Sequence, residues 1–319
     1  MNINNVEPAK QSVVAHYQPK ITIDSSSLST LYRIHAYGIV VLPIIGLITA
    51  VLLALNFGIS PIDFSLFLIL WLLSGLGIEV GFHRYLSHRS FQTSTPIRVL
   101  LAIFGSMAGQ GPPIYWVANH RRHHQYSDVI GDTHSPHLHG QGFWGRIQGL
   151  WYAHFGWIFD LELTNTYLFA KDLLRDGAIA KVNQYYYVWV FLGLALPAVV
   201  GGILTGSIIG LFTGFLWGGL VRMFVVHQTT YAVNSICHLY GNRPFKSLDQ
   251  STNNFWLAIP TLGGSWHNNH HAFPDSAING LKWWQVDLSG WLLKAMKTLG
   301  LIWDVKTISL ERIEAKKTA

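Results

Sequence analysis

The feature that most constrains this chain is a stretch from residue 182 to residue 221 that contains no Asp, Glu, Lys or Arg. A bilayer-spanning helix needs about 20 mostly apolar residues, so this stretch is too long for one membrane span and suits two. Two earlier apolar segments with the same character predict a further helical hairpin. We therefore predict four membrane spans, over about residues 36–57, 62–81, 187–204 and 208–226.

The composition agrees with a membrane location. Only 12% of the 319 residues are charged and 50% are hydrophobic, whereas a soluble domain carries about 25% charged residues. Lys and Arg concentrate in the cytoplasmic loops of membrane proteins, and the two predicted hairpin tips, residues 58–62 and 205–207, contain neither. This asymmetry predicts that both termini and both large polar segments lie on the cytoplasmic side.

The polar segments that follow each hairpin predict a helical cap over one end of the spans. The single cysteine, Cys237, excludes an intramolecular disulfide and a thiolate metal cluster. The predicted fold class is an all-α integral membrane protein with four transmembrane helices and a cytosolic helical cap. We expect a polar N-terminal segment, a membrane domain with a cap in two parts, and a C-terminal cytosolic tail, over residues 1–30, 31–290 (cap 82–186 and 227–290) and 291–319.

Histidine is the unusual residue, because its 16 copies equal Asp and Glu together. Residues three and four apart share one face of a helix, so an H-x-x-H-H sequence presents three imidazoles from one turn. Two such sequences and an H-x-x-x-x-H pair supply more nitrogen ligands than one metal takes, which indicates two metals, and imidazole suits Zn, Cu, Fe and Ni. The three clusters are His83 with His88, His120-Arg-Arg-His123-His124 and His267-Asn-Asn-His270-His271.

Other interpretations of these clusters are weaker. A single histidine is usually a polar surface residue, but chance does not readily produce two H-x-x-H-H sequences. The net charge of +6 is compatible with nucleic acid, yet no groove-reading motif accompanies HRRHH, so we expect no nucleic-acid partner. The H-E-x-x-H sequence of zinc proteases and the E-x-x-H sequence of soluble di-iron bundles are both absent from the chain.

The segments GFHRYLSHRSF, NHRRHHQYSD and GGSWHNNHHAFP resemble the three histidine boxes of the membrane fatty acyl desaturases of the stearoyl-CoA desaturase type. VNSICHLYGNRPF resembles that family's fourth metal-binding stretch, and the match runs in order from about residue 35 to residue 285. The resemblance implies four membrane helices beneath a cytosolic cap that holds two iron ions.

The resemblance also implies the ligands of each iron. One iron takes His83, His88, His120, His124 and His270. The other takes His123, His238, His267 and His271, and Asn234 holds a water bound at the metal site. Because His238 follows Asn234 by four residues, both would face one way on a helix.

Further residues are candidates for supporting or substrate roles. Asp132 and His134 match a D-x-H sequence of the family, and Glu79, four residues before His83, is placed to hydrogen-bond a ligand imidazole. A headgroup location is an equal alternative for Glu79. Gln110 and Trp116 resemble positions that line the bend of the acyl chain. Tyr231 stands where the family has an aromatic residue, and Asn119 replaces the acid that acyl-CoA enzymes often carry before the second box.

The activity that the resemblance implies is oxygen-dependent desaturation, in which a cis double bond, expected at Δ9, forms in a saturated acyl chain. The departure at Asn119 leaves acyl-CoA and acyl-lipid substrates open. The alternatives are a related di-iron hydroxylase and a non-enzymatic metal transporter. A transporter should carry ionisable residues at mid-membrane, and the predicted spans have almost none.

No flavin, nicotinamide or haem-binding sequence is recognisable, so we expect a separate electron donor, a ferredoxin or a cytochrome b5-like protein with its reductase. A basic cytoplasmic face suits an acidic carrier. We expect Arg121 and Arg122 to project away from the metals and meet phosphates or the cap. The segment GQGFWGRIQGLWYAH resembles bacterial members of the family, which implies the bacterial inner membrane.

Overall fold

The computed structural model describes residues 20–160 and 162–318, so most of the predicted segment over residues 1–30 lies outside the described residues. Within the described chain, four helices are long and apolar enough to cross a membrane, which confirms the predicted fold class. They are α1 (Ser26–Phe57), α2 (Pro61–Leu76) continued by the π-helix η1 (Gly77–Ser87), α9 (Tyr186–Thr205), and α10 (Ile208–Gly214) continued by the π-helix η3 (Phe215–Val221), α11 (Arg222–Ser235) and η4 (Ile236–His238).

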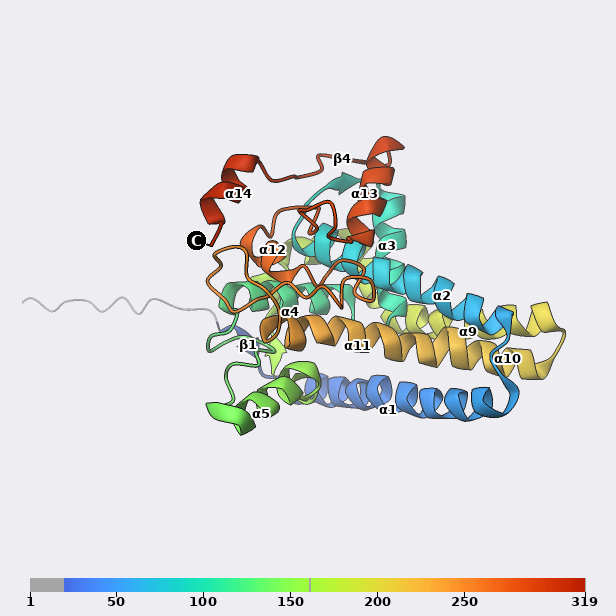
Figure 1. Cartoon of the computed structure of the whole chain (residues 1–319). Coiled ribbons are helices and arrows are strands. Elements are labelled where there is room, and N and C mark those ends of the chain that lie inside the picture. Colours follow the sequence, from blue (N-terminus) through green and yellow to red (C-terminus); the bar gives the residue numbers. More distant parts are fainter. Residues whose placement is uncertain (1–19, 161, 319) are drawn as a thin grey trace, which may run out of the picture.

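The two hairpin turns lie together at one end of the molecule and the cap lies at the other (Figure 1). Apolar side chains along the spans are exposed, among them Leu55 at 79% and Ile203 at 73%, as expected for surfaces that face lipid. The second hairpin turns at Gly206, which has a φ of 60° that only glycine adopts readily. Its helices touch closely, because a Cβ on Gly214 would overlap the Pro197 carbonyl.

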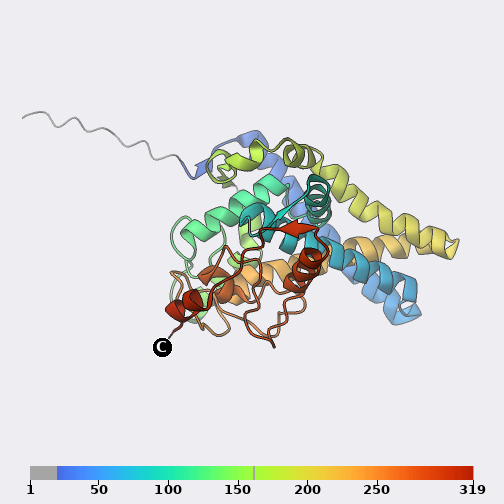
Figure 2. The same cartoon turned by 90° about the horizontal axis from the view of Figure 1, so that it is seen from above.

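Short helices and two small antiparallel strand pairs build the cap (Figure 2). The strand pairs are β1 (Thr22–Ile23) with β3 (Leu163–Thr164) and β2 (Gln92–Thr93) with β4 (Ile302–Trp303). The cap helices are α3 (Thr95–Met107), α4 (Pro113–Tyr126), α5 (Gly142–His154), η2 (Gly156–Phe159), α6 (Thr166–Phe169), α7 (Lys171–Leu174), α8 (Gly177–Gln184), α12 (His267–Ala272), α13 (Leu288–Thr298) and α14 (Leu310–Lys316).

Two span-forming helices extend into the cap beyond the predicted spans. The second runs to Ser87 and the fourth to His238, whereas the hydropathy of the sequence ends them at residues 81 and 226. Hydropathy falls at the first polar residues, but the backbone keeps its helical hydrogen bonds there because the cap buries those residues. Continuous helices therefore carry His83 and Asn234 from the membrane into the cap.

The described part of the segment that the sequence predicts as a tail, residues 291–318, packs on the cap. Leu293 of α13 is fully buried in a cluster with Val80 and Phe91, and β4 pairs with β2. The main-chain N–H of Lys246 donates to the Lys316 carbonyl at 2.7 Å. Apolar residues in this polar segment therefore pack against η1 and the loop after it.

A buried ion pair fixes η1 against the loop before α13. Arg84 Nη2 donates to Asp287 Oδ1 at 2.7 Å, and the two side chains are only 1% and 2% exposed. The Asp287 carboxylate also accepts the main-chain N–H groups of Asn279, Gly280 and Gly290. Because Arg84 directly follows His83, this pair holds one of the histidine clusters in place.

We expect Asp287→Ala to lower the free energy of unfolding by about 3–5 kcal/mol, because it leaves a buried guanidinium without its counter-charge. The matched control is Asp275→Ala, since Asp275 pairs with Arg312 at a half-exposed site and such pairs contribute about 0–1 kcal/mol. Thermal unfolding of the purified protein in detergent compares the two. An equal decrease in the stability of both variants would show that the buried ion pair stabilises the fold no more than the surface pair does.

Candidate metal centre

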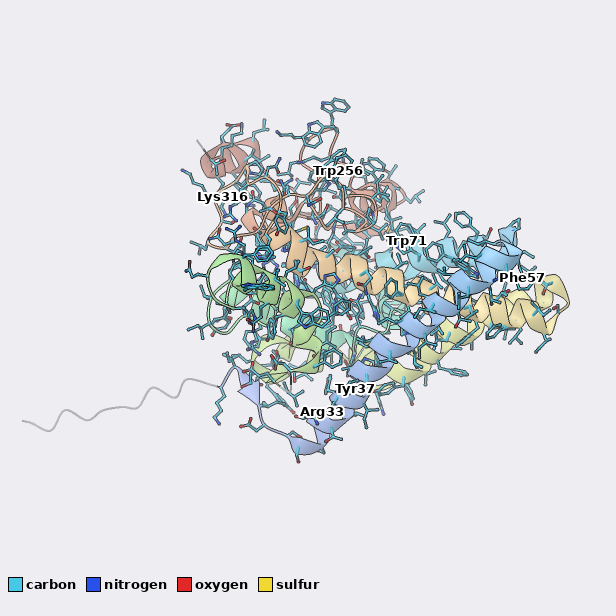
Figure 3. The ribbon with its side chains drawn as sticks, turned by 60° about the horizontal axis from the view of Figure 1, so that its bottom comes forward. Arg33, Tyr37, Phe57, Trp71, Trp256 and Lys316 are labelled. Carbon is cyan, nitrogen blue, oxygen red and sulfur yellow. The ribbon has the colours of Figure 1, made fainter. Side chains whose placement is uncertain are left out.

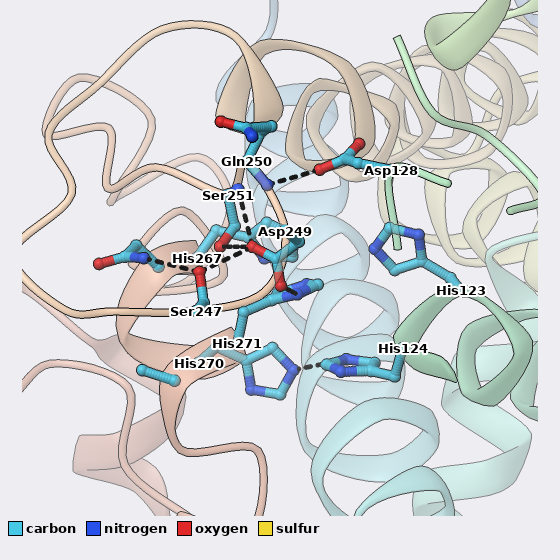
Figure 4. A network of polar contacts seen from close by, with 12 residues as sticks. His123, His124, Asp128, Ser247, Asp249, Gln250, Ser251, His267, His270 and His271 are labelled. Carbon is cyan, nitrogen blue, oxygen red and sulfur yellow. Dashed lines mark hydrogen bonds and ion pairs between the residues drawn. The ribbon is translucent and has the colours of Figure 1, made fainter. Parts of the chain in front are cut away.

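Nine histidines meet in the cap in two groups, within each of which the ligand nitrogens lie within 4.8 Å of one another. Figure 4 shows members of both groups side by side. They are the two sets that the sequence resemblance implies. The first group is His83, His88, His120, His124 and His270; the second is His123, His238, His267 and His271.

The distances within each group suit nitrogen atoms that share one metal ion. In the first group, His83 Nε2 and His124 Nε2 each lie 3.0 Å from His270 Nε2. In the second, His238 Nε2 lies 3.0 Å from His267 Nε2. Two imidazole nitrogens bound at right angles to one ion, each at about 2.1 Å, would themselves be about 3 Å apart.

A π-helix brings the first histidine pair together. His83 and His88 are five residues apart, and an α-helix would direct them about 140° from each other. In η1 and its C-cap the His88 N–H instead donates to the His83 carbonyl at 3.2 Å, the i→i+5 bond of a π-helix. The two rings consequently have centroids 5.0 Å apart, which the sequence spacing alone does not predict.

The two H-x-x-H-H turns lie on α4 and α12, and each serves both groups. On α4, His120 and His124 join the first group and His123 joins the second. α12 gives one histidine to the first group and two to the second. His270 joins the first group, and His267 and His271 join the second. Each of these turns therefore bridges the two groups.

The two arginines of the α4 turn point away from the histidines and hold the cap together. Arg121 donates to the carbonyls of Leu86 and Ser87 at the end of η1 and pairs with Asp172 at 2.6 Å. Arg122 donates to the Gly131 carbonyl at 2.7 Å and pairs with Glu162. Both arginines thus meet the cap, one of the two partners expected from the sequence.

Four carboxylates orient one histidine each through its Nδ1–H. Asp132 accepts from His123 at 2.8 Å and Glu79 lies 3.2 Å from His83 Nδ1, and both acids are sequence candidates for this role. The sequence reasoning missed the other two, Asp128 on His238 at 2.9 Å and Asp249 on His271 at 2.6 Å. A carboxylate on Nδ1 fixes the tautomer that leaves the Nε2 lone pair bare.

Buried imidazole nitrogens without a hydrogen-bond partner indicate whether the residues fit a metal. Within the described part of the chain, the Nε2 atoms of His123 and His271 are buried and have no hydrogen-bond partner. Burial, followed by neighbouring imidazoles, lowers the pKa of most of the remaining histidines well below 6.5, in particular His88, His120, His124, His267 and His270. Neutral imidazoles that direct lone pairs into two common volumes fit two cations.

The supporting carboxylates stay ionised beside these rings. Burial alone would raise the pKa of Asp132 and Asp249, but the His123 and His271 partners outweigh burial and lower both below the usual range. In the same region, His134 lies near His123 and Asp132, its main-chain N–H donates to Asp132 Oδ1 at 3.2 Å, and burial lowers its pKa to about 3. His134 therefore supports the Asp132 carboxylate.

A cavity next to the first histidine group collects the sequence candidates for substrate binding. Gln110, Trp116, Asn119 and Tyr231 all line it, together with His120, His134 and Asn234. The Trp116 ring stacks on His120 with centroids 5.1 Å apart. Gln110 accepts from Trp116 Nε1 at 3.2 Å and donates to Thr230 Oγ1 at 2.9 Å. These hydrogen bonds fix the cavity wall beside the group.

Hydrogen-bonded polar groups surround the part of the cavity that is lined by α1. His35 lines the cavity, and its Nε2 lies 3.2 Å from the hydroxyl of the buried Tyr186, which accepts the Gly111 N–H at 2.9 Å. His227 Nε2 donates to the Ala108 carbonyl at 2.7 Å. These hydrogen bonds fix the side chains around this part of the cavity.

Comparison with known proteins identifies the family. The family model described as "Fatty acid desaturase" matches residues 60–298. The chain is 49% identical to hex-5-enoyl-[acyl-carrier protein] acetylenase from Moorena producens (strain JHB) over 307 residues, which is 96% of each chain.

Two other relatives carry names for desaturation at a different position. The chain is 36% identical to the sn-1 stearoyl-lipid 9-desaturase of Anabaena variabilis over 254 residues, 79% of this chain and 86% of the relative. It is 38% identical to Delta-9 acyl-lipid desaturase 1 of Arabidopsis thaliana over 240 residues, 75% of this chain and 73% of the relative.

Proposed function

Because the chain belongs to the fatty acid desaturase family, we propose that it dehydrogenates a short acyl chain held on acyl carrier protein. The observation that carries this proposal is a small cavity that reaches His120 of the first group of imidazoles. The balanced reaction is R–CH2–CH2–R′ + O2 + 2 e⁻ + 2 H⁺ → R–CH=CH–R′ + 2 H2O. The two electrons come from a separate one-electron carrier.

The nine histidines are proposed to hold two iron ions, one in each group, with Asn234 contributing through a water. Bound iron supplies the redox chemistry with O2 that removes hydrogen from unactivated carbons, which no side chain can do by acid–base means. The four carboxylates keep Nε2 of His123, His238, His271 and His83 free to bind. The cavity excludes water from the reacting carbons and positions them beside His120.

The size of the cavity supports a short acyl chain. Its volume of about 60 Å³ has room for about four to six water molecules. A cavity this small favours a short acyl chain over a stearoyl chain, for which the wall would have to open further. A longer chain would have to separate His35 from Tyr186 or displace Ile39, which also lines the cavity.

The identity of the relatives agrees with this substrate class. The Moorena producens relative is named for a six-carbon chain on acyl carrier protein, and Asn119 departs from the acyl-CoA pattern. That relative is an acetylenase, so removal of two hydrogens from an existing double bond is within the same proposal. A saturated acyl chain on CoA or on lipid, desaturated at Δ9, is the second candidate, supported by the two relatives named for that position.

We further propose that the cap and both termini face the cytoplasm of a bacterium whose inner membrane holds the four spans. The hairpin tips without Lys or Arg support this orientation. Carrier-bound acyl chains are soluble, so a cytoplasmic cap gives them access to the cavity. A ferredoxin or a cytochrome b5-like protein is the proposed class of electron donor.

Enlarging the part of the cavity lined by α1 should change the preferred chain length. Ile39→Ala removes a buried side chain from the cavity wall, and we expect the preferred acyl chain to lengthen by about two carbons. The measurement is kcat/KM for a series of acyl chains on acyl carrier protein, CoA and lipid. The matched control on the same helix is Ile34→Ala, because Ile34 is 66% exposed and its loss should leave the series unchanged.

Three outcomes of this series separate the candidates. Conversion of six-carbon carrier-bound chains supports the first candidate, and conversion of stearoyl chains alone supports the second. Hydroxylated products would indicate the hydroxylase alternative. An unchanged chain-length profile for folded Ile39→Ala protein would contradict the proposed limit that the cavity sets on chain length.

A further inference from the structure

We propose that a groove on the outer side of the cap docks an acidic soluble one-electron carrier and is the route by which electrons reach both histidine groups. The groove has a volume of about 640 Å³ and is lined by His88, His124 and His271 together with the cations of Arg121, Lys246 and Lys316. This inference rests on the proposed function, because it assigns a partner to that reaction.

Members of both histidine groups line the groove. His88 and His124 of the first group are only partly buried, and His271 of the second group lines the same surface. Asp249, which accepts the Nδ1–H of His271 at 2.6 Å, lies in the groove as well. A protein seated here would lie close to imidazoles of each group.

The free charges of the groove are positive. Lys246 and Lys316 are exposed, and among the described residues neither forms an ion pair. The main-chain bond from the Lys246 N–H to the Lys316 carbonyl, 2.7 Å long, places the two residues beside each other. The one acid in the groove, Asp249, is occupied by His271 and Ser251, so the surface that remains suits an acidic partner.

An apolar side chain completes the rim. Leu248 lies two residues after Lys246, lines the groove and is fully exposed at 106%. Electron-transfer partners bind through small surfaces in which charge steers the encounter and a few apolar contacts hold it. The arrangement of Leu248 between lysines fits that kind of transient contact.

The position of the groove suits a soluble protein and leaves the substrate path free. α14, which carries Lys316, lies at the end of the molecule away from the hairpin turns (Figure 1), and Figure 3 shows Lys316 far from Phe57 at those turns. The substrate cavity is lined instead by α1, η2 and α11 and meets the first group at His120. The carrier can therefore bind while an acyl chain occupies the cavity.

The electron count matches repeated docking. Each encounter oxidises one carrier by one electron, so two encounters supply the two electrons of the balanced reaction. A transient, salt-sensitive contact allows the spent carrier to leave between the two transfers.

The test uses the full-length protein in lipid nanodiscs and an oxidised, acidic [2Fe–2S] ferredoxin as probe. We expect Lys246→Glu with Lys316→Glu to weaken ferredoxin binding about tenfold or more at low salt, and wild-type binding to weaken as salt rises. The matched control, Lys294→Glu with Lys297→Glu, makes the same charge change on exposed residues of α13 and should bind within about twofold of wild type.

Lys316 also donates to the Ala272 carbonyl at 2.6 Å, so the single variant Lys246→Glu, which loses no such contact, is tested beside the double variant. Both variants should raise the KM for ferredoxin and leave product formation with dithionite as reductant unchanged. Binding equal to wild type for folded double variant would overturn the proposed surface. Absence of product from wild-type protein with dithionite would instead overturn the proposed function, whatever the binding result.

Discussion

Replacing His123 by alanine is expected to lower the iron content of the purified protein from two ions per chain to about one and to abolish formation of the unsaturated product. His123 belongs to a group of four imidazoles, and metal sites that lose one of four protein ligands bind far more weakly. Its carboxylate partner Asp132, which is 8% exposed, would also lose the hydrogen bond from His123 Nδ1–H.

Iron analysis by mass spectrometry and product analysis of the same sample measure both effects. The matched control is His139→Ala, because His139 belongs to neither group and lies against the Tyr152 ring instead. Two irons per chain in folded His123→Ala protein would contradict the assignment of this residue as a ligand.

Asp249→Asn should weaken binding of the second iron by about 10–100-fold while the first iron stays bound. The asparagine amide can donate to His271 Nδ1, which would move the ring proton to Nε2 and block the lone pair that a metal needs. The change keeps the size of the side chain, so the effect reports on the tautomer more than on packing. Titration with a competing chelator measures the affinity of each iron.

Asp275→Asn is the control for this substitution, because Asp275 contacts Arg312 on the surface and no histidine of either group. Asp132→Asn should reproduce the Asp249→Asn result through His123. If both variants keep wild-type iron affinity, the carboxylates contribute only to packing.

The histidine clusters were predictable because their chemistry is local in the sequence. H-x-x-H-H needs only one helical turn to bring its imidazoles together, and α4 and α12 supply that turn. The uncharged stretch from residue 182 to residue 221 likewise predicts two spans, because membrane helices depend on composition over about 20 neighbouring residues.

Two of the four supporting carboxylates could not be predicted from local sequence spacing. Asp128 lies 110 residues from its partner His238 in the sequence, and Asp249 lies 22 residues from His271, so no local spacing connects them. By contrast, Glu79 is one helical turn from His83 and could be proposed from the sequence. Tertiary contacts decide which acids reach the rings, and such contacts leave no periodic signal.

The backbone geometry of η1 and the size of the cavity also could not be predicted from the sequence. The π-helical turn that brings His83 and His88 together lies against α3 and α4, and the side-chain pattern does not distinguish it from an α-helix. The hydrogen bonds around the cavity at His35 and Tyr186 join residues far apart in the chain. The resemblance alone therefore leads to the expectation of a stearoyl-type chain with its double bond at Δ9. The proposal of a shorter acyl chain rests on the cavity.

A single-turnover experiment tests the central claim most directly. Iron-loaded protein in nanodiscs is reduced with dithionite without oxygen, given a six-carbon acyl carrier protein substrate and then exposed to O2. Mass spectrometry of the acyl chain should show a product lighter by two hydrogens, which His123→Ala protein does not form. A product heavier by one oxygen, or an unchanged chain on protein that holds two irons, would contradict desaturation as the function.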